Sequence, residues 1–287
     1  MNLIRSDYIF FGFGKITNHL INHLHGQGKS IVCVTNQTQP GSEKSNLRFI
    51  TRERLIQEKV IAEVAIFGWI DTSPLSKDLN EWLLTNSFKV QKSFMLSSAS
   101  VYKSSLEALN EDQRNLSPDH MVNKKYCLER ELLAIFRDKG TSHTNLRISN
   151  VYGAGLNHGF IAVLLKSLIS QSPANIYNQT QITRDYISIN DLCKAIEELS
   201  KLESKLEVLN VSTGVGINLA EILELFENLG SKIDFRKYLN APCQTRMRVV
   251  LDCSLLKSII QWDPVSLKIG ISQILTHQEF MSPESSS

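Results

Sequence analysis

Several features that mark specialised protein classes are missing from this 287-residue sequence. Its 31 basic and 29 acidic residues leave a net charge of only +2, and no basic segment with interleaved aromatics indicates nucleic-acid binding. The five cysteines have no metal-ligand spacing, which favours reduced thiols in a cytoplasmic protein without a metal site. The longest N-terminal apolar run, YIFFGFG, is too short to cross a membrane and lacks the layout of a signal peptide.

What the sequence does contain is enough hydrophobic residues, 42%, for a substantial core. Strand-like and helix-like segments alternate over roughly the first half of the chain, which predicts a doubly wound parallel α/β sheet, the Rossmann fold. The segments are strands at 7–14, 30–36, 60–70, 93–102 and 144–153, and helices at 15–28, 79–88 and 121–136. We expect a dinucleotide-binding domain from 1–148 plus 180–212, an interleaved substrate-binding region from 149–179 plus 213–281, and a disordered tail at 282–287.

The helix predicted over 121–136 carries an unusual residue on its apolar face. Leu128, Leu132 and Phe136 follow the spacing of a buried helical stripe, and Met121 and Lys125 fall on the same face. The Lys125 side chain either extends along that face to reach water or points inward at a ligand.

A glycine turn connects the first predicted strand to the first helix. Gly12 and Gly14 stand where dinucleotide folds place a diphosphate over a helix N-terminus, because a Cβ there would block the phosphates. The third glycine of the G-x-G-x-x-G pattern is replaced by Thr17. The turn therefore predicts a phosphate site, although any tight strand-to-helix turn produces a similar pattern.

The second strand also lacks a residue that is typical of NAD-binding folds. Thr35 stands where an aspartate or glutamate would bind the adenosine ribose, so selection against a 2′-phosphate is absent. Lys44, Arg48 and Arg52 are candidates to bind such a phosphate. NADP is therefore at least as plausible a cofactor as NAD. The predicted dinucleotide contacts are Gly12, Phe13, Gly14, Lys15, Ile16, Thr35, Asn36, Ser97 and Lys125.

Several motifs occur in the order found in one enzyme family. They are LSSASVY, the Lys125-x-x-x-Glu129 helix, LRISNVYGAG, TRDYISINDLCKAI, LNVSTG and LDCSLLKSIIQWDP. Nearly the whole chain thus resembles the extended short-chain dehydrogenases, which include the nucleotide-sugar epimerases and dehydratases. The resemblance implies a nicotinamide cofactor, a nucleotide-sugar or other small-molecule substrate and a homodimer, with no nucleic-acid or membrane partner.

The resemblance implies catalytic roles for two residues and shows that the family's catalytic tyrosine is missing. The family serine corresponds to Ser98, and the family lysine, which binds the nicotinamide ribose and lowers the pKa of a tyrosine, corresponds to Lys125. The tyrosine position, four residues earlier, is occupied by Met121, whose thioether cannot transfer a proton. His120 and Tyr102 are the candidates to replace it.

On the substrate side the resemblance is again partial. Asn150 matches an asparagine that contacts the sugar diphosphate, and Arg184 matches an arginine that contacts the nucleotide phosphates, unless it pairs with Asp185 instead. A further family arginine is missing from the segment Ala241-Pro242-Cys243. The candidate substrate-binding residues are Asn150, Arg184, Arg246 and Arg248.

These losses leave the activity open between two main hypotheses. The first is a nucleotide-sugar epimerase- or dehydratase-like enzyme with atypical or weakened catalysis. The second is a non-catalytic relative that binds a dinucleotide or a sugar nucleotide as a sensor or scaffold. A plain NADP-dependent carbonyl reductase is disfavoured by the same missing tyrosine.

Overall fold

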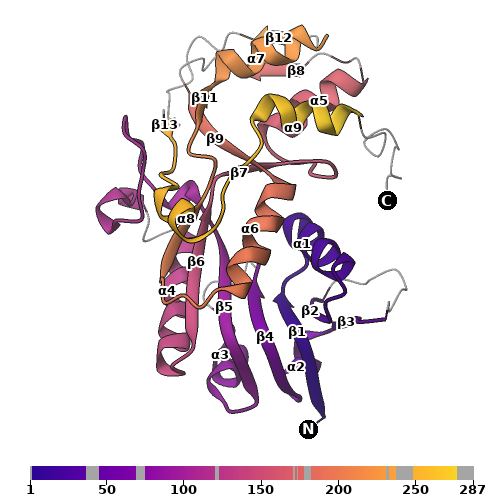
Figure 1. Cartoon of the computed structure of the whole chain (residues 1–287), viewed down its shortest axis with the longest axis vertical. Coiled ribbons are helices and arrows are strands. Elements are labelled where there is room, and N and C mark those ends of the chain that lie inside the picture. The colour runs from indigo at the N-terminus through magenta and orange to yellow at the C-terminus, as the bar shows by residue number, and fades with distance from the viewer. Residues whose placement is uncertain are drawn as a thin grey trace. The chain divides into compact units, whose positions relative to one another are not determined.

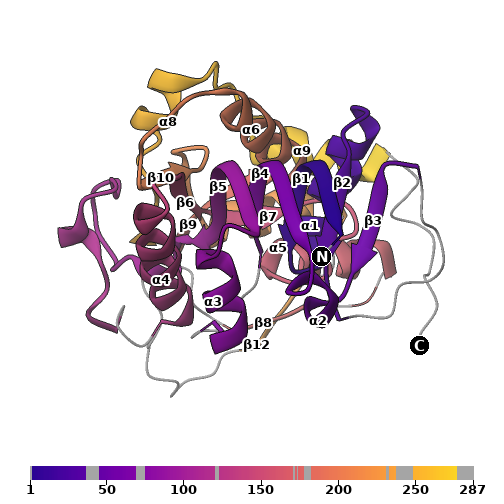
Figure 2. The ribbon, with the colours of Figure 1, turned by 90° about the horizontal axis from the view of Figure 1, so that it is seen from below.

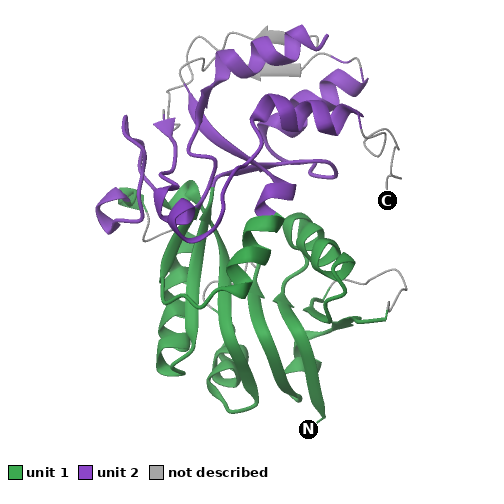
Figure 3. Ribbon diagram, viewed as in Figure 1, with its two compact units in different colours: residues 1–101, 116–148, 193–210 green, residues 102–115, 149–192, 211–287 purple. Residues whose placement is uncertain are grey.

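The chain forms two compact units in the computed structural model (Figure 3). The structure describes residues 2–36, 45–68, 75–119, 123–170, 172, 182–230 and 248–276, and the backbone of 174–177 and 233–236. Unit 1 consists of Met1–Val101, Leu116–Ile148 and Cys193–Asn210. Unit 2 consists of Tyr102–Asn115, Ser149–Leu192 and Val211–Ser287.

This division differs from the predicted domain boundaries in two places. Residues 102–115 belong to unit 2 because Ser105 and Leu109 form backbone hydrogen bonds with Arg248 and Val250. Residues 180–192 also belong to unit 2, because the strand that they contain pairs with other strands of that unit. The proposed tail, 282–287, lies outside the described residues.

A seven-stranded sheet forms the centre of unit 1, with the order β10-β6-β5-β4-β1-β2-β3 (Figure 1). All neighbouring pairs from β3 through β6 are parallel. This arrangement confirms the predicted doubly wound fold. The strands are β1 (Leu3–Phe11), β2 (Ile31–Val34), β3 (Leu47–Ile50), β4 (Lys59–Phe67), β5 (Phe88–Ser98), β6 (Ser142–Ile148) and β10 (Val208–Val211).

Helices cover both faces of this sheet, which explains the continuous apolar runs in its central strands. On one face, α2, α3 and α4 share a single core with the strands, and on the other α1 and α6 are joined by an ion pair between His23 and Glu197 (Figure 2). The helices are α1 (Lys15–Gly26), α2 (Arg52–Leu55), α3 (Lys77–Leu84), α4 (Lys124–Asp138) and α6 (Ile189–Lys201), the last belonging to unit 1 from Cys193 onward.

The order of the strands places a switch point between β1 and β4. The chain runs outward from β1 through β2 to β3, then returns to β4 and continues in the other direction. In open α/β sheets, ligands bind outside the carboxyl ends of the strands at such a point. Gly12 and Gly14 follow β1, and Gly68 follows β4, so all three lie at this position.

Unit 2 is built around a small sheet and three packed helices. Strand β9 pairs with β7, β11 and β13, and β8 pairs with β12. Apolar residues of α5, α7 and α9 share one core with Tyr152 and Tyr186. The elements are β7 (Asn150–Tyr152), α5 (Phe160–Ser170), β8 (Ala174–Tyr177), β9 (Thr183–Ser188), β11 (Gly216–Asn218), α7 (Leu219–Asn228), β12 (Ile233–Arg236), β13 (Arg248–Val249), α8 (Ser254–Ile259) and α9 (Leu267–Thr276).

One predicted helix boundary is wrong. Helix α4 begins at Lys124, three residues after the predicted start, and the extended backbone of Asn123 forms its N-cap. The apolar periodicity suggested a longer helix, but the Asn123 carboxamide accepts a hydrogen bond from the Lys125 N–H and ends the helix there. Of the helices in the described ranges, none combines the length and apolar character needed to cross a bilayer.

Candidate functional site

The turn after β1 is shaped by two glycines and one threonine. Gly12 has a φ of 100°, a backbone conformation that favours glycine, and Gly14 is the extended N-cap of α1. A Cβ added to Gly14 would meet only the Thr17 Oγ1 atom, at 3.8 Å. The space over Gly14 is therefore open.

Thr17 closes this turn with a single hydroxyl group. Its Oγ1 accepts a hydrogen bond from the Gly14 N–H at 2.6 Å and donates one to the Gly14 carbonyl at 2.9 Å. The side chain is 2% exposed, and its methyl group packs where any Cβ on Gly68 would collide with it. A threonine therefore fits at position 17, where the pattern has its third glycine, because Gly68 has no side chain that would collide with the Thr17 methyl group.

The start of α1 keeps donors that can bind an anion. The first intrahelical bond runs from Asn18 N to Gly14 O at 2.8 Å, so the N–H groups of Lys15 and Ile16 have no acceptor among the described residues. The first turn contains no acidic residue. These residues fit a diphosphate, which a helix N-terminus attracts through its free N–H groups and its dipole.

The residues predicted to bind the adenosine end of the dinucleotide, near the carboxyl end of β2, differ in where the structure places them. Thr35 is buried and Asn36 is exposed, and the Asn36 Oδ1 atom accepts a hydrogen bond from Arg52 N at 3.4 Å. Arg48 instead lines a groove beside the first residues of β1 and β2, at the amino ends of the strands. Arg52 is thus the described arginine next to Asn36, and Lys44 lies outside the described residues.

The end of β5 and the start of α4 are connected by the carboxamide of Asn123. Its Nδ2 group lies 3.3 Å from the carbonyl and from the hydroxyl of Ser100, while its Oδ1 atom caps the Lys125 N–H at 3.0 Å. The half-buried Ser98 hydroxyl accepts the Ser100 N–H at 3.1 Å. One side chain therefore connects the segment that carries Ser98 to the helix turn that carries Lys125.

Lys125 is half-buried, and its ammonium group has no hydrogen-bond acceptor within the part of the chain that is described. Burial lowers the pKa of Lys125 from its ordinary value, and the carboxylate of Glu129 opposes that shift. An ammonium group that is partly desolvated and unpaired is costly, and such groups are enriched at binding sites.

The partner of Glu129 is Arg147 rather than Lys125. Arg147 Nη2 donates to Glu129 Oε2 at 2.8 Å, and both side chains are 2% exposed. The Ser97 hydroxyl also donates to Glu129. Because Glu129 is bound by Arg147 and Ser97, the Lys125 ammonium group has no carboxylate partner among the described residues. The Ser97 hydroxyl is likewise occupied by its hydrogen bond to Glu129.

The residues predicted to replace the family tyrosine as proton donor are Tyr102 and His120. The Tyr102 side chain is fully buried, at 0% exposure, which is the environment of a core residue. His120 and Met121 lie outside the described residues.

Unit 2 brings Asn150 and Arg184 into the same sheet. The exposed Asn150, on β7, pairs in register with Tyr186 on β9, and its Nδ2 group donates to the Asp185 carbonyl at 3.0 Å. The Arg184 Nη1 group donates to the Thr183 carbonyl at 2.8 Å.

The alternative pairing of Arg184 with Asp185 is not formed. The fully buried Asp185 carboxylate accepts hydrogen bonds from Thr213 Oγ1 at 2.7 Å and from Gly214 N at 2.9 Å. Successive residues of a strand point to opposite faces, so the two side chains diverge. Asp185 anchors the turn after β10 rather than neutralising Arg184.

The remaining two arginines give no direct support to the substrate prediction. Arg248 lies on β13, next to Thr183 of β9, but its Nη1 group donates to the carbonyl of Glu107 at 3.1 Å. It therefore holds the 102–115 segment of unit 2. Arg246 lies outside the described residues.

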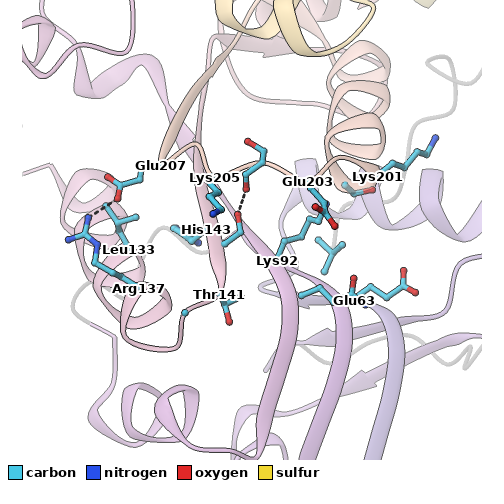
Figure 4. Close-up of a pocket in the computed structure, with 16 residues that line it drawn as sticks. Glu63, Lys92, Leu133, Arg137, Thr141, His143, Lys201, Glu203, Lys205 and Glu207 are labelled. Carbon is cyan, nitrogen blue, oxygen red and sulfur yellow. Dashed lines mark hydrogen bonds and ion pairs between the residues drawn. The ribbon is translucent and has the colours of Figure 1, made fainter.

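A cavity of about 860 Å³ opens in unit 1 at the amino ends of the strands (Figure 4). Lys92, which lines it, pairs in register with Ser142, the first residue of β6. Arg137 contacts Glu207 at 2.7 Å, and the Lys92 ammonium group donates to the Leu202 carbonyl. None of the predicted site residues lines this cavity.

A match to a protein-family model identifies the family of this chain. The model for the NAD dependent epimerase/dehydratase family matches residues 69–212, which is half of the chain. The chain belongs to this family. The resemblance drawn from the sequence motifs is thus confirmed.

Two curated relatives are similar to this chain over much of its length. A dTDP-4-dehydro-6-deoxyglucose reductase from Escherichia coli is 28% identical over 191 residues, which are 63% of this chain and 59% of that protein. A UDP-glucuronate 4-epimerase from Thermodesulfobacterium geofontis is 28% identical over 210 residues, which are 70% of this chain and 63% of that protein. The alignments thus span about three fifths of the length of each relative.

Solved structures extend the likeness of fold over almost the whole chain. MoeE5 in complex with UDP-glucuronic acid and NAD superposes with a TM-score of 0.78 at 21% identity, covering 94% of this chain and 98% of that one. A UDP-glucose 4-epimerase from Thermotoga maritima gives 0.77 at 18% identity, covering 96% and 98%. These identities establish the epimerase/dehydratase fold alone.

Sequence reasoning missed two functional neighbours of the site. Asn123 could have been found, because asparagine before a helix is a common N-cap. The pairing of Arg147 with Glu129 could not, because both residues are far apart in the sequence and meet only when α4 packs on β6.

Proposed function

We propose that this protein binds a nicotinamide dinucleotide through unit 1 and a nucleotide sugar through unit 2, with proton transfer weaker than is usual in its family. The observation that carries the proposal is Lys125, whose ammonium group is half-buried and has no acceptor among the described residues. A protein tolerates such a group where a ligand supplies the missing acceptor.

The dinucleotide half of the proposal rests on the turn at the switch point. The N–H groups of Lys15 and Ile16 would bind the diphosphate, and the open space over Gly14 admits it. Asn36 would contact the adenosine ribose, with Arg52 beside it to accept a 2′-phosphate. NADP and NAD are therefore both suitable, and the described residues after β2 include no acid that would select NAD.

Lys125 and Ser98 would act on the reacting end. The dinucleotide supplies the hydride chemistry when it is bound. Lys125 would donate hydrogen bonds to its nicotinamide ribose, and the Ser98 hydroxyl would bind a substrate oxygen. Arg147 would keep Glu129 neutralised, which leaves the Lys125 ammonium group available. His120 is the candidate to move the proton in place of the tyrosine, because Tyr102 is fully buried.

The nucleotide-sugar half rests on unit 2 and on the curated relatives. Arg184 would contact a diphosphate, to which its planar guanidinium is better suited than an ammonium group. The Oδ1 atom of Asn150 has no partner among the described residues and would accept a sugar hydroxyl. The relatives are named for UDP-, dTDP-, ADP- and GDP-linked sugars, so nucleotide sugars are the candidate substrates.

A non-catalytic role is the second candidate function. By the family resemblance, Met121 stands at the tyrosine position, and Tyr102 is fully buried. A protein that retains the binding residues but lacks a proton donor would act as a sensor or scaffold for a dinucleotide or sugar nucleotide.

One experiment separates the two. The protein is incubated with NAD or NADP and a panel of UDP-, dTDP-, ADP- and GDP-sugars, and products are separated by chromatography for the wild type, Ser98→Ala and His120→Ala. Slow conversion that both variants abolish supports the enzyme. Calorimetric binding of a dinucleotide and of a sugar nucleotide without conversion supports the non-catalytic role, and absence of both kinds of binding contradicts the proposal.

A homodimer in the cytoplasm completes the proposal. Family resemblance supports a dimer formed through the helix that carries Lys125 and the one before it, α4 and α3. Light scattering coupled to size-exclusion chromatography tests the dimer, with the mass of a single chain, 32.4 kDa, as the contradicting result.

A further inference from the structure

The strongest unexplained feature of the proposed dinucleotide site is Thr17. A threonine replaces the glycine that ends the G-x-G-x-x-G pattern, and its hydroxyl forms two hydrogen bonds with the backbone of Gly14. We infer that the Thr17 hydroxyl competes with the diphosphate for the Gly14 N–H, and so weakens dinucleotide binding by this protein. This inference rests on the proposed function.

The geometry gives the hydroxyl little freedom to move aside. Threonine is stiff at χ1, and the Thr17 methyl group is wedged where a Cβ on Gly68 would collide with it. Gly68 is itself held by a hydrogen bond from its N–H to the Phe11 carbonyl at 2.9 Å. With the methyl group fixed against the end of β4, the hydroxyl points at Gly14 of the turn.

The same hydroxyl stabilises the protein without ligand. It satisfies the N–H of the N-cap residue, a donor that a diphosphate at this helix start would otherwise take. Binding must then either leave that donor with Thr17 or break a hydrogen bond of 2.6 Å to use it. Removing the hydroxyl should therefore lower the stability of the protein and raise its affinity for a dinucleotide. A residue with a purely structural role would not change the two in opposite directions.

Three substitutions separate the hydroxyl from the methyl group. Thr17→Val keeps the shape and removes the hydroxyl, Thr17→Gly removes both groups, and Thr17→Ser keeps only the hydroxyl. We expect Thr17→Val and Thr17→Gly to bind NADH or NADPH roughly threefold to tenfold more tightly than the wild type, the range of one neutral hydrogen bond. Thr17→Ser should bind within about twofold of the wild type, because the Gly14 N–H stays occupied.

The test is calorimetric titration of the four proteins with NADH and with NADPH, together with their melting temperatures without ligand. Thr17→Val should melt about 2–4 °C below the wild type while binding more tightly. Tighter binding by Thr17→Val and Thr17→Gly, but not by Thr17→Ser, supports the inference. If only Thr17→Val and Thr17→Gly bind a dinucleotide, the inference is also supported, but the proposal that the wild type binds one is contradicted. Equal or weaker binding by Thr17→Val and Thr17→Gly than by a wild type that binds overturns the inference and leaves the proposed function standing. Absence of binding by all four proteins overturns both.

Discussion

The two edges of the sheet in unit 1 differ in how their polar groups are matched. At the amino ends of the strands, a cavity of about 860 Å³ is lined by charged side chains of both signs, among which Arg137 pairs with Glu207 and the Lys92 ammonium group donates to the Leu202 carbonyl. At the carboxyl ends, the Lys15 and Ile16 N–H groups and the Lys125 ammonium group have no acceptor among the described residues. The volume of a cavity alone points to the amino edge, whereas these donors point to the carboxyl edge.

The comparison shows that unmatched donors and empty space point to opposite edges of the same sheet. The half-buried Lys125 ammonium group, which has no acceptor among the described residues, is costly without a ligand, and the helix start at the switch point supplies further donors for an anion. His143, at the amino edge, shows the contrast. It hydrogen-bonds Ser93 and Asn145, and burial lowers its pKa to about 4, so it is a neutral and satisfied core residue.

The largest effect is expected from the buried ion pair beneath the carboxyl edge. Arg147→Met leaves the Glu129 carboxylate buried without its partner, and should lower the free energy of unfolding by ~3–5 kcal/mol. Arg137→Ala breaks the exposed pair with Glu207 at the amino edge and should cost at most ~1 kcal/mol. Urea unfolding of both variants measures the difference, and similar losses would contradict the contrast between the edges.

The next effect concerns the space over Gly14. Gly14→Val places a branched side chain where the diphosphate approaches, and should weaken dinucleotide binding by roughly 100-fold or more, about 2.7 kcal/mol. Gly26→Val, at the far end of the same helix and with no atom within 4 Å of its Cβ, is the matched control and should bind as the wild type does. Equal binding by Gly14→Val and the wild type would remove the glycine turn from the site.

A third prediction compares two arginines of unit 2. Arg184→Ala should weaken binding of a UDP- or dTDP-sugar by ~1.5–3 kcal/mol, the scale of a hydrogen bond to a charged group. Arg248→Ala is the control, because its guanidinium already donates to the Glu107 carbonyl and should affect stability more than affinity. Calorimetry that finds unchanged affinity for Arg184→Ala would exclude Arg184 from the site.

The smallest effect is a pH dependence of stability at Lys125. Its pKa is lowered in the folded protein, so the unfolded chain binds the proton more tightly, and folding stability should rise as the pH increases through the folded pKa. Lys125→Met removes this cost and should stabilise the protein at neutral pH, with a gain that shrinks towards pH ~10. Urea midpoints across the pH range test this, with the exposed Lys124→Met as control. A gain that is the same at every pH would show that desolvation of the ammonium group is not the cause.

The sequence predicts most of the fold but only part of the site. Continuous apolar runs identify β1, β4 and β5 as strands covered on both faces, and the Gly12 turn follows from its position after β1. The start of α4 is missed because periodicity continues through Asn123, where a side-chain cap overrides it. The role of Thr17 depends on Gly68, which is distant in sequence and is brought close only by the pairing of β1 with β4.

The most direct test of the account is a calorimetric titration of NAD, NADH, NADP and NADPH into the wild type and into Lys125→Met. We predict that at least one dinucleotide binds the wild type and that Lys125→Met binds it roughly tenfold or more weakly, because a charge-assisted hydrogen bond is lost. Absence of binding by the wild type, or equal affinity in the two proteins, would contradict the claim that the unmatched donors at the carboxyl edge are there to bind a dinucleotide.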